Sequence, residues 1–534
     1  MIPTIQTLIF LLIVIAAVAF AEARLRIPAA ILLVLVGVIL GLIPGLPAVE
    51  LAPELVLLLV LPPLIYSSAV AMSWREFRFN LRPISLLALG CVAFTTVATA
   101  AAAHWALGLP WPVGFVLGAI VSPPDAVAPL SVARRMQLPR RILVVLEGEG
   151  LANDATALVL YRFAVAAVSA GMFSLGDAAA AFAAIVAGEV AWGLVVGWLM
   201  LRLRRWVGDP RIEITLSLIT PFLAYWPPEY LGGSGVLATV TAGLYISWNG
   251  LQLISAATRL QGIFFWDFLI YLVEGLVFVT TGLQAHTLIA RIGQYPLLDL
   301  AISAVVISAV VIVARFVWVF PAVYVPRWLS SRIRRRDPAP PWQQAFVLAF
   351  TGVRGIVSLA AALAIPFATE TGMPFPGRDL ILFLTFSVIL VTLVGQGLML
   401  PTVIRALGLA HAGRREHEAG KAEECEARRQ AAIAALSRLD ELTAAGKFSE
   451  EILRPIRTRQ RHRLEHIEHG NDLDERNRNF RDLHDEIEFL LIGTERRHIN
   501  EQYRRGILTD VSRRRIEREL DLREAELLNQ RAEE

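Results

Sequence analysis

Apolar residues dominate the chain from its first residues to about position 408, in stretches long enough to cross a bilayer. A spanning helix needs roughly 20 apolar residues, and Pro, Gly or polar turns divide these stretches into about 13 candidate spans. The predicted spans begin near residues 3, 27, 52, 83, 112, 142, 175, 211, 232, 263, 297, 342 and 377. The pattern therefore predicts an all-α integral membrane protein.

The chain changes character after residue 410, where long apolar runs end and charged residues of both signs become frequent. Mixed charge of this kind is typical of solvated helices. We therefore expect a transmembrane domain over residues 1–410 and a charged, helical regulatory tail over residues 411–534.

Arginines fall in alternate loops between the predicted spans, as expected when cytoplasmic loops collect positive charge. Even-numbered loops carry only Arg291 and Arg378. Odd-numbered loops carry Arg24, Arg26, Arg75, Arg78, Arg82, Arg134, Arg135, Arg140, Arg141, Arg202, Arg204, Arg205, Arg211, Arg259, Arg327, Arg332, Arg334, Arg335 and Arg336. With an odd number of spans, this alternation predicts an N-terminus outside the cell and a cytoplasmic tail.

Composition agrees with a membrane protein and narrows its chemistry. Of the 534 residues, 55% are hydrophobic, and the mean hydropathy is +0.56, which is not that of a water-soluble domain. The net charge of +3 is too small to indicate nucleic-acid binding. Cys91 lies in an apolar stretch and Cys425 in the charged tail, so we expect neither a disulfide nor a thiolate metal site.

The fifth predicted span contains a helix break next to an acidic residue. Pro123 and Pro124 remove two helical N–H donors in mid-membrane and free carbonyls upstream, near Ala119 and Ile120. Irregular backbone at that depth must be buried in protein or line a wet cavity. Asp125 can compensate the positive N-terminal end of the following half-helix. A plain proline kink with a buried, neutral Asp125 is the alternative.

Three carboxylates in a short stretch mark the sixth predicted span. Glu147, Glu149 and Asp154 are costly in a membrane, at roughly 2.5–3.5 kcal/mol each on insertion scales, so each requires a partner or a function. Asn153 shares a helical face with Glu149. In the twelfth span, Arg354 lies between glycines and offers a buried cation to a carboxylate. The alternative is that Arg354 snorkels to a membrane face.

Spans five and twelve occupy matching positions if spans 1–6 and 8–13 form two inverted halves joined by span seven. Transporters commonly bind their substrate where two such interrupted helices meet near the midplane. The arrangement therefore favours transport. The remaining buried charges have no spacing that names a partner, and we interpret them as structural ion pairs or snorkelling residues: Arg162, Glu189, Glu213, Asp267, Glu274 and Arg315.

Three blocks of sequence resemble one family of membrane transporters. Residues 122–163 (SPPDAVAPLSVARRMQLPRRILVVLEGEGLANDATALVLYRF) resemble the signature region of bacterial sodium/proton exchangers of the monovalent cation:proton antiporter-1 family, the NhaP-like exchangers. Residues 352–366 (GVRGIVSLAAALAIP) resemble its arginine-bearing helix, and residues 61–69 (LPPLIYSSA) resemble its third-span block. The likeness covers the whole membrane domain in order and span count.

The resemblance implies two inverted six-helix repeats with crossed, interrupted helices, a homodimer in the bacterial plasma membrane, and alternating access. It implies that Asp154 binds the cation and the proton in turn, with support from Asn153 and Asp125. It also implies that an ion pair of Glu149 with Arg354 stabilises the helix breaks. Asn rather than Asp at position 153 goes with electroneutral one-for-one exchange, although Glu147 or Asp125 offers a further titrating group.

The chain departs from the family pattern at several expected cation ligands. Related exchangers often have Thr-Asp-Pro where this chain has Pro-Asp-Ala at residues 124–126, a serine where it has Gly150, and a carboxylate where it has Tyr-Ser-Ser at residues 66–68. The candidate replacements are water, backbone carbonyls at the proline break, and the hydroxyls of Ser122, Ser67 and Ser358. Family frequency favours Na⁺, and Li⁺ or K⁺ stays open.

Two other classes of function compete with antiport. A cation channel, or an ion or pH sensor that signals through the tail, would use the same buried charges without proton counterflow. A membrane enzyme is disfavoured because the spans contain no nucleophile–base pair and no His-Glu-x-x-His metal spacing. We therefore expect no enzymatic activity and no cofactor, and we expect monovalent cations, protons, membrane lipid and a second copy of the chain as partners.

Overall fold

A computed structural model describes residues 2–25, 27–43, 53–170, 175–250, 253–292, 295–369, 372–446, 448–469, 475–505 and 507–532. These residues form helices and short connections, with one isolated bridge between Ala368 and Pro374. The all-α prediction is therefore confirmed. The chain divides into two compact units, Met1–Arg414 and Arg415–Glu534.

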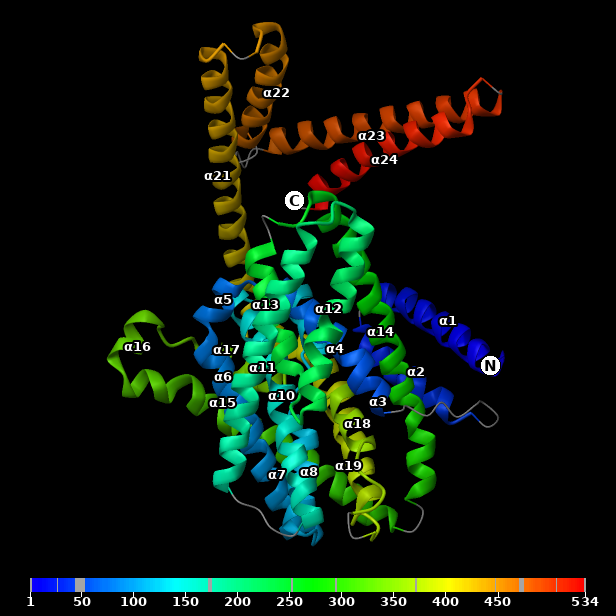
Figure 1. Cartoon of the computed structure of the whole chain (residues 1–534), viewed down its shortest axis with the longest axis vertical. Helices are drawn as coiled ribbons and strands as arrows, with labels where there is room; N and C mark the ends of the chain where they lie inside the picture. Colours follow the sequence, from blue (N-terminus) through cyan, green and yellow to red (C-terminus); the bar gives the residue numbers. More distant parts are fainter. Residues whose placement is uncertain are drawn as a thin grey trace. The chain divides into compact units, whose positions relative to one another are not determined.

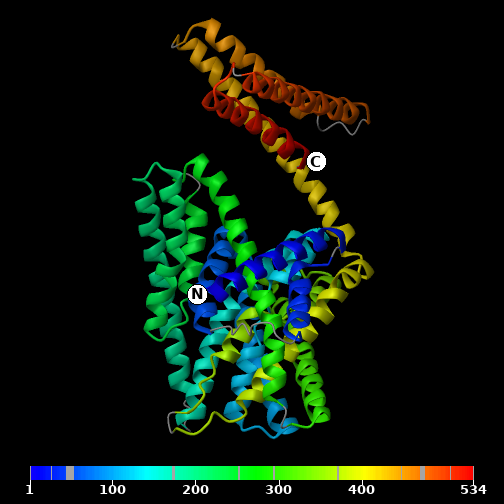
Figure 2. The ribbon, with the colours of Figure 1, turned by 90° about the vertical axis from the view of Figure 1, so that its right-hand side faces the viewer.

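The first unit is a bundle of helices (Figures 1 and 2). Its α-helices are α1 (Ile2–Leu25), α2 (Ala29–Gly41), α3 (Pro53–Leu55), α4 (Leu61–Ala71), α5 (Trp74–Phe79), α6 (Leu81–Ser85), α7 (Val92–Leu107), α8 (Trp111–Val121), α9 (Val127–Arg135), α10 (Arg140–Ala170), α11 (Leu175–Arg204), α12 (Pro210–Tyr230), α13 (Val236–Asn249), α14 (Ala256–Arg291), α15 (Leu297–Leu329), α16 (Ser331–Arg336), α17 (Trp342–Phe350), α18 (Ile356–Leu363), α19 (Arg378–Leu390) and α20 (Gly397–Ala406). In the described part of this unit, π-helical segments join neighbouring helices at η1 (Val56–Val60), η2 (Leu86–Cys91) and η4 (Val391–Gln396).

Each predicted span coincides with a helix or a run of joined helical segments that begins near its predicted start. The largest difference is at α14, which begins at Ala256 rather than near residue 263. Among the described residues, 7 helices are long and apolar enough to cross a membrane by length and composition, and α2, the segment from η1 to α4, and α8 are shorter apolar helices. The order of the spans is therefore observed, while the number that crosses the bilayer stays a prediction.

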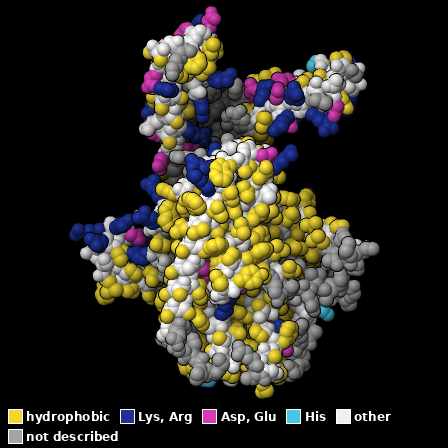
Figure 3. Space-filling model, in the orientation of Figure 1, with side chains coloured by type: hydrophobic (Ala, Val, Ile, Leu, Met, Phe, Trp, Pro, Cys, Tyr) yellow, Lys and Arg dark blue, Asp and Glu magenta, His cyan; other side chains and the backbone are white. Residues whose placement is uncertain are grey.

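Apolar side chains cover most of the described face of the first unit in Figure 3. Large hydrophobic residues are exposed along its long helices, among them Phe264 of α14 at 75% and Val305 of α15 at 67%. Soluble proteins rarely expose contiguous apolar surface of this extent. The surface is that of a multi-pass membrane protein surrounded by lipid.

Two helices are interrupted at the positions that the prolines and glycines indicate. The first break separates α8 from α9 at residues 122–126, and the second separates α17 from α18 at residues 351–355. Contacts join α8 to α18. The predicted breaks in spans five and twelve are therefore present, and parts of the two interrupted helices pack together.

Glycines allow α2 and α14 to approach each other at backbone distance. A Cβ atom on Gly282 would lie 2.3 Å from the carbonyl oxygen of Val34, and one on Gly37 would lie 2.3 Å from that of Val279. Both approaches are far inside van der Waals contact, so neither helix accepts a side chain at this crossing. The contact fixes the position of α14, which carries Glu274.

We predict that Gly282→Val lowers the stability of the solubilised protein by about 1–3 kcal/mol, because the added side chain forces α2 away from α14. Gly262→Val is the matched control on the same helix, since a Cβ there meets nothing within 4 Å. Thermal unfolding in detergent measures both variants. Equal loss of stability in the two would show that the close approach is not what matters.

The second unit contains most of α21 (Leu409–Ala444), with α22 (Glu450–His469), α23 (Glu475–Arg504) and α24 (Asp510–Ala532). Helices α23 and α24 pack as a pair, with Arg496 2.6 Å from Glu524 and 2.7 Å from Asp521. The division between the units falls after Arg414, close to the predicted boundary at residues 410/411. The regulatory role of the tail stays a prediction.

Candidate functional site

The two breaks touch each other through their backbones. The N–H of Asp125 donates to the carbonyl oxygen of Val353 at 2.7 Å, which joins the break after α8 to the break after α17. Interrupted helices leave N–H and C=O groups without helical partners at both broken ends. In a membrane these groups must find partners inside the protein, so each broken end requires a nearby group that can hydrogen-bond to it.

Arg354 supplies donors at the C-terminal end of α8. Its Nε donates to the carbonyl oxygen of Val121 at 2.9 Å, one Nη donates to that of Ser122 at 3.3 Å, and the other donates to that of Gly352. The side chain is fully buried, at 1% exposure. A cation is favourable there because the C-terminal end of a helix carries negative partial charge. Arg354 therefore does not snorkel.

Arg315 of α15 has the same role at the end of α17. Two of its nitrogens donate to the carbonyl oxygen of Leu348, at 3.1 and 3.3 Å, and two donate to the carboxylate of Glu149, at 2.5 and 2.8 Å. Both side chains of this ion pair are buried. The pair lies at the end of one interrupted helix and ties it to α10.

The predicted partner of Glu149 is Arg354, and this prediction is wrong. The carboxylate pairs with Arg315, and the donors of Arg354 bind the carbonyls at the two breaks. A Cβ on Gly352 would lie 2.4 Å from Arg315 Cδ and 2.8 Å from Arg354 Nη1, so both arginines lie against this glycine. Arg315 had a signal in the sequence: no Asp, Glu, Lys or other Arg occurs between Leu300 and Pro326.

Asp125 lies at the N-terminal ends of two half-helices. Its Oδ1 accepts from the backbone N–H of Val127 at 2.9 Å, at the start of α9, and the carboxylate also accepts from the N–H of Ile356, at the start of α18. A Cβ on Gly355 would lie 1.7 Å from Asp125 Oδ2, so only glycine fits beside it. The carboxylate therefore compensates two positive helix ends, one more than we predict from the sequence.

Asn153 anchors α10 to the first break. Its amide donates to the carbonyl oxygen of Pro124 at 2.6 Å, so it satisfies a group that the proline pair leaves without a helical partner. The side chain is fully buried, and its Oδ1 has no hydrogen-bond partner among the described residues. Asn153 thus fixes the position of Asp154 relative to the break.

Asp154 lines a cavity of about 330 Å³ next to this crossing. Of the predicted site residues, Asp154, Asp125, Glu147 and Ser358 line it, together with Ser68 and Glu274. Within the described part of the chain, no hydrogen bond or ion pair holds the Asp154 carboxylate. Glu147, in contrast, pairs with Arg134 at 2.6 Å. Asp154 is therefore a carboxylate without a hydrogen-bond or ion-pair partner among the described residues, next to two interrupted helices.

Two predicted hydroxyl ligands do not line the cavity: Ser122, predicted to bind the cation, and Ser67, predicted as an auxiliary group. The Ser122 hydroxyl donates to the carbonyl oxygen of Ala119 at 3.2 Å, and the Ser67 hydroxyl donates to that of Leu64 at 3.0 Å. Each therefore bonds within its own helix. Ser68 lines the cavity instead of its neighbour. Ser358 also lines the cavity, and its buried hydroxyl has no hydrogen-bond partner among the described residues.

Glu274 is the site residue that the sequence pattern does not identify. It projects from α14 and lines the cavity together with Asp125 and Asp154. The sequence shows Glu274 only as a carboxylate in an apolar run that also contains Asp267, and we interpret both as structural. The third span lacks the carboxylate common in related exchangers, and Glu274 brings a carboxylate to the cavity from a different helix.

Two of the other charges predicted to be buried have structural partners, whereas Asp267 is exposed on α14. Glu189 of α11 accepts from the backbone N–H groups of Ser234 at 2.6 Å and Leu237 at 3.0 Å, which caps the start of α13. Arg162 of α10 forms an ion pair with Glu229 of α12. These contacts tie α11 to α13 and α10 to α12, and none of their residues lines the ion cavity.

A model of the family described as "Sodium/hydrogen exchanger, transmembrane" matches residues 8–406. The chain belongs to the sodium/hydrogen exchanger family. The match covers all of the helices that build the cavity. The exchanger is thus a multi-pass membrane protein whose substrates are monovalent cations and protons, and its activity is cation:proton antiport.

Relatives of known sequence agree with this assignment. An uncharacterised Na⁺/H⁺ exchanger of Mycobacterium tuberculosis is 35% identical over 545 residues, which cover 98% of this chain and 97% of that protein. A sodium, potassium, lithium and rubidium/H⁺ antiporter of Bacillus subtilis is 36% identical over 391 residues, which cover 70% of this chain and 57% of that protein. The likeness to the mycobacterial protein therefore includes the tail.

A solved structure agrees with the fold. The sodium proton antiporter MjNhaP1 of Methanocaldococcus jannaschii superposes with a TM-score of 0.61 at 20% identity, over 76% of this chain and 97% of that chain. At this identity the likeness concerns the fold alone. It confirms that the exchanger has the helical architecture predicted for an NhaP-like protein.

The ion pair at the second break allows a direct test. We predict that Glu149→Gln and Arg315→Gln each destabilise the exchanger by about 3–5 kcal/mol, because each leaves a buried charge without its partner. The double variant should lose much less than the sum, as thermal unfolding in detergent would show.

The matched comparison combines Glu149→Gln with Arg354→Gln. Arg354 binds backbone carbonyls rather than Glu149, so the losses in this second cycle should be closer to additive. A larger coupling energy in the cycle with Arg354 than in the cycle with Arg315 would contradict the assigned ion pair.

Proposed function

We propose that the exchanger carries one monovalent cation against one proton, with Na⁺ as the favoured cation, and that the two ions compete for the carboxylate of Asp154. The observation that supports this most is the uncommitted Asp154 carboxylate in the cavity. A carboxylate in a low-dielectric environment favours neutralisation by a proton or a bound cation. Because one carboxylate holds one of them at a time, competition couples the two fluxes.

The cavity offers oxygen ligands of the kind that hard cations prefer. Asp125 contributes a carboxylate, although hydrogen bonds to two helix ends hold it in place. Ser358 contributes a buried hydroxyl without a partner, and Ser68 contributes a second hydroxyl. Glu274 completes the set from α14. These groups replace the ligands that the chain lacks relative to related exchangers.

One-for-one exchange follows from which groups are free to titrate. Asn153 carries no charge, Glu149 is bound to Arg315, and Glu147 is bound to Arg134. Asp125 faces two helix ends that stabilise its charged form. With Glu274 acting only as a cation ligand, Asp154 is the one group that exchanges its proton, and transport is electroneutral.

The wider arrangement is also part of the proposal. Alternating access of the cavity, a homodimer, and a bacterial plasma membrane follow from the resemblance to NhaP-like exchangers. The alternation of arginine-rich loops supports an N-terminus outside and a tail in the cytoplasm. A cytoplasmic tail is in a position to regulate exchange.

We predict that Asp154→Asn abolishes exchange in everted vesicles, measured as dissipation of a preset pH gradient when Na⁺, Li⁺ or K⁺ is added. Asp267→Asn is the matched control, because Asp267 is exposed on α14 and does not line the cavity. An imposed membrane potential should leave the wild-type rate unchanged. Cation-driven proton movement that persists in Asp154→Asn would contradict the mechanism, and potential-dependent exchange would contradict the stoichiometry.

We also predict that Glu274→Gln raises the cation concentration needed for half-maximal exchange by about 3- to 10-fold, the upper value being 1.4 kcal/mol. The maximal rate should change little, because Asp154 still exchanges its proton. The Asp267→Asn variant is again the control. A fall in maximal rate with unchanged apparent affinity would assign Glu274 a structural role.

A further inference from the structure

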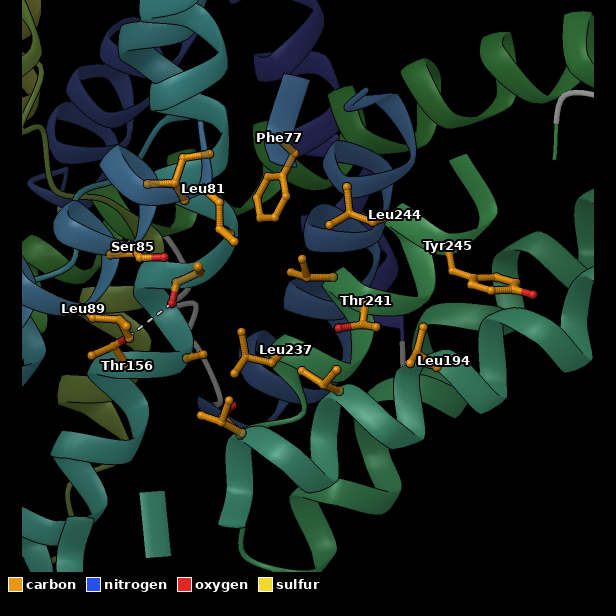
Figure 4. A pocket seen from close by; sticks show the side chains of 18 of the residues that line it. Phe77, Leu81, Ser85, Leu89, Thr156, Leu194, Leu237, Thr241, Leu244 and Tyr245 are labelled. Atoms are coloured by element: carbon orange, nitrogen blue, oxygen red, sulfur yellow. Dashed lines mark hydrogen bonds between the residues drawn. The ribbon is translucent and has the colours of Figure 1, made fainter. Parts of the chain in front are cut away.

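A second cavity, of about 690 Å³, lies on the other side of α10 from the ion cavity. In Figure 4 its labelled side chains form two walls: Leu81, Ser85, Leu89 and Thr156 on one side, and Leu194, Leu237, Thr241, Leu244 and Tyr245 on the other. The first wall comes from α6, η2 and α10, and the second comes from α11 and α13. The cavity therefore separates two groups of helices.

The lining is suited to hydrocarbon. None of the described lining residues is Asp, Glu, Lys, Arg or His. The Thr156 hydroxyl donates to the carbonyl oxygen of Ala152 at 3.4 Å, and the Ser234 hydroxyl donates to the Glu189 carboxylate, so both are already bound. Pockets of this size hold small organic ligands, and a ligand here gains chiefly by burying apolar surface.

One end of the cavity has the features of a membrane interface. Trp74 and Phe77 of α5 line the cavity, as does Trp248 near the C-terminal end of α13, and α5 contacts α13. Tryptophans concentrate at the headgroup level of a bilayer. Arg78 is four residues after Trp74 on α5, so by helical spacing it shares a face of this helix with that lining residue, and its side chain is exposed.

We propose that this pocket binds an acyl chain of an anionic phospholipid, whose phosphate is held by Arg78. The charge complementarity of Arg78 and the uncharged lining select this occupant over a zwitterionic lipid and over a polar solute. The pocket and the ion cavity share no lining residue, but both touch α10, through Ala155 and Asp154 respectively. Occupancy of the pocket changes the rate of exchange because the lipid contacts the helix that carries Asp154.

Binding is tested without any ion gradient, so its outcome does not depend on the proposed function. The full chain is reconstituted in phosphatidylcholine vesicles that contain a trace of phosphatidylglycerol with a photoreactive acyl chain. After illumination, the labelled peptides are mapped by mass spectrometry. We expect label on α10 and α13, several-fold above that from the matching phosphatidylcholine probe.

Variants that fill the pocket make the test specific. Leu237→Trp and Thr241→Trp should each reduce this labelling several-fold, while Leu223→Trp on the exposed face of α12, outside the pocket, should leave it unchanged. Arg78→Gln should remove the preference for phosphatidylglycerol, and Arg334→Gln on exposed α16 should preserve it. If one of the two pocket-filling variants does not fold, the other still tests the binding site.

Labelling that both pocket-filling variants retain would overturn the binding site, and equal labelling by the two lipids would overturn the role of Arg78. The effect on rate rests on the proposed exchange and is measured in vesicles with and without phosphatidylglycerol. The wild-type rate should depend on this lipid several-fold, and the Leu237→Trp rate should not. If both rates respond equally, the pocket does not control exchange even where labelling locates the lipid in it.

Discussion

The structure depends on satisfying the broken ends of two helices inside a membrane. Lipid offers no hydrogen bonds to the carbonyl and N–H groups that an interrupted helix leaves unpaired. This exchanger provides charged side chains of matching sign: Arg354 at the end of α8, Arg315 at the end of α17, and Asp125 at the beginnings of α9 and α18. Each charge is opposite to the partial charge of the helix end that it contacts.

This arrangement determines which carboxylate is left to exchange ions. Arg315 is neutralised in part by Glu149, and Asn153 uses its amide to hold the first break through Pro124. Asp125 is bound by backbone N–H groups. Among the described residues, Asp154 has no hydrogen bond or ion pair of this kind, although it lies on α10 close to Glu149 and Asn153. Glu149 and Asn153 are therefore used to stabilise the helix breaks, and Asp154 is available for the cation and the proton.

Much of the fold and part of the site could be predicted from the sequence, because they depend on local signals. Apolar run length predicts the spans, and Pro123 with Pro124 predicts the first break. The partner of Glu149 depends instead on how distant helices pack: Arg315 is 166 residues away in the chain, and nothing in the local pattern relates the two. The position of Glu274 in the cavity could not be predicted for the same reason, because it depends on how α14 packs against distant helices.

The choice between Ser67 and Ser68 shows a different limit. Adjacent residues on a helix point about 100° apart, so a site prediction requires the correct helical phase. The π-helical segment η1 precedes α4 and alters that phase. Ser68 lines the cavity, and the hydroxyl of Ser67 bonds to its own helix.

The central claim is that the cation and the proton compete for the Asp154 carboxylate. Calorimetric titration of the purified exchanger with Na⁺, repeated in buffers of different protonation enthalpy, counts the protons released for each cation bound. We predict release that approaches one proton per cation at the pH where the unbound site is protonated. Cation binding with no proton release at any pH, or release that is unchanged in Asp154→Asn, would contradict it.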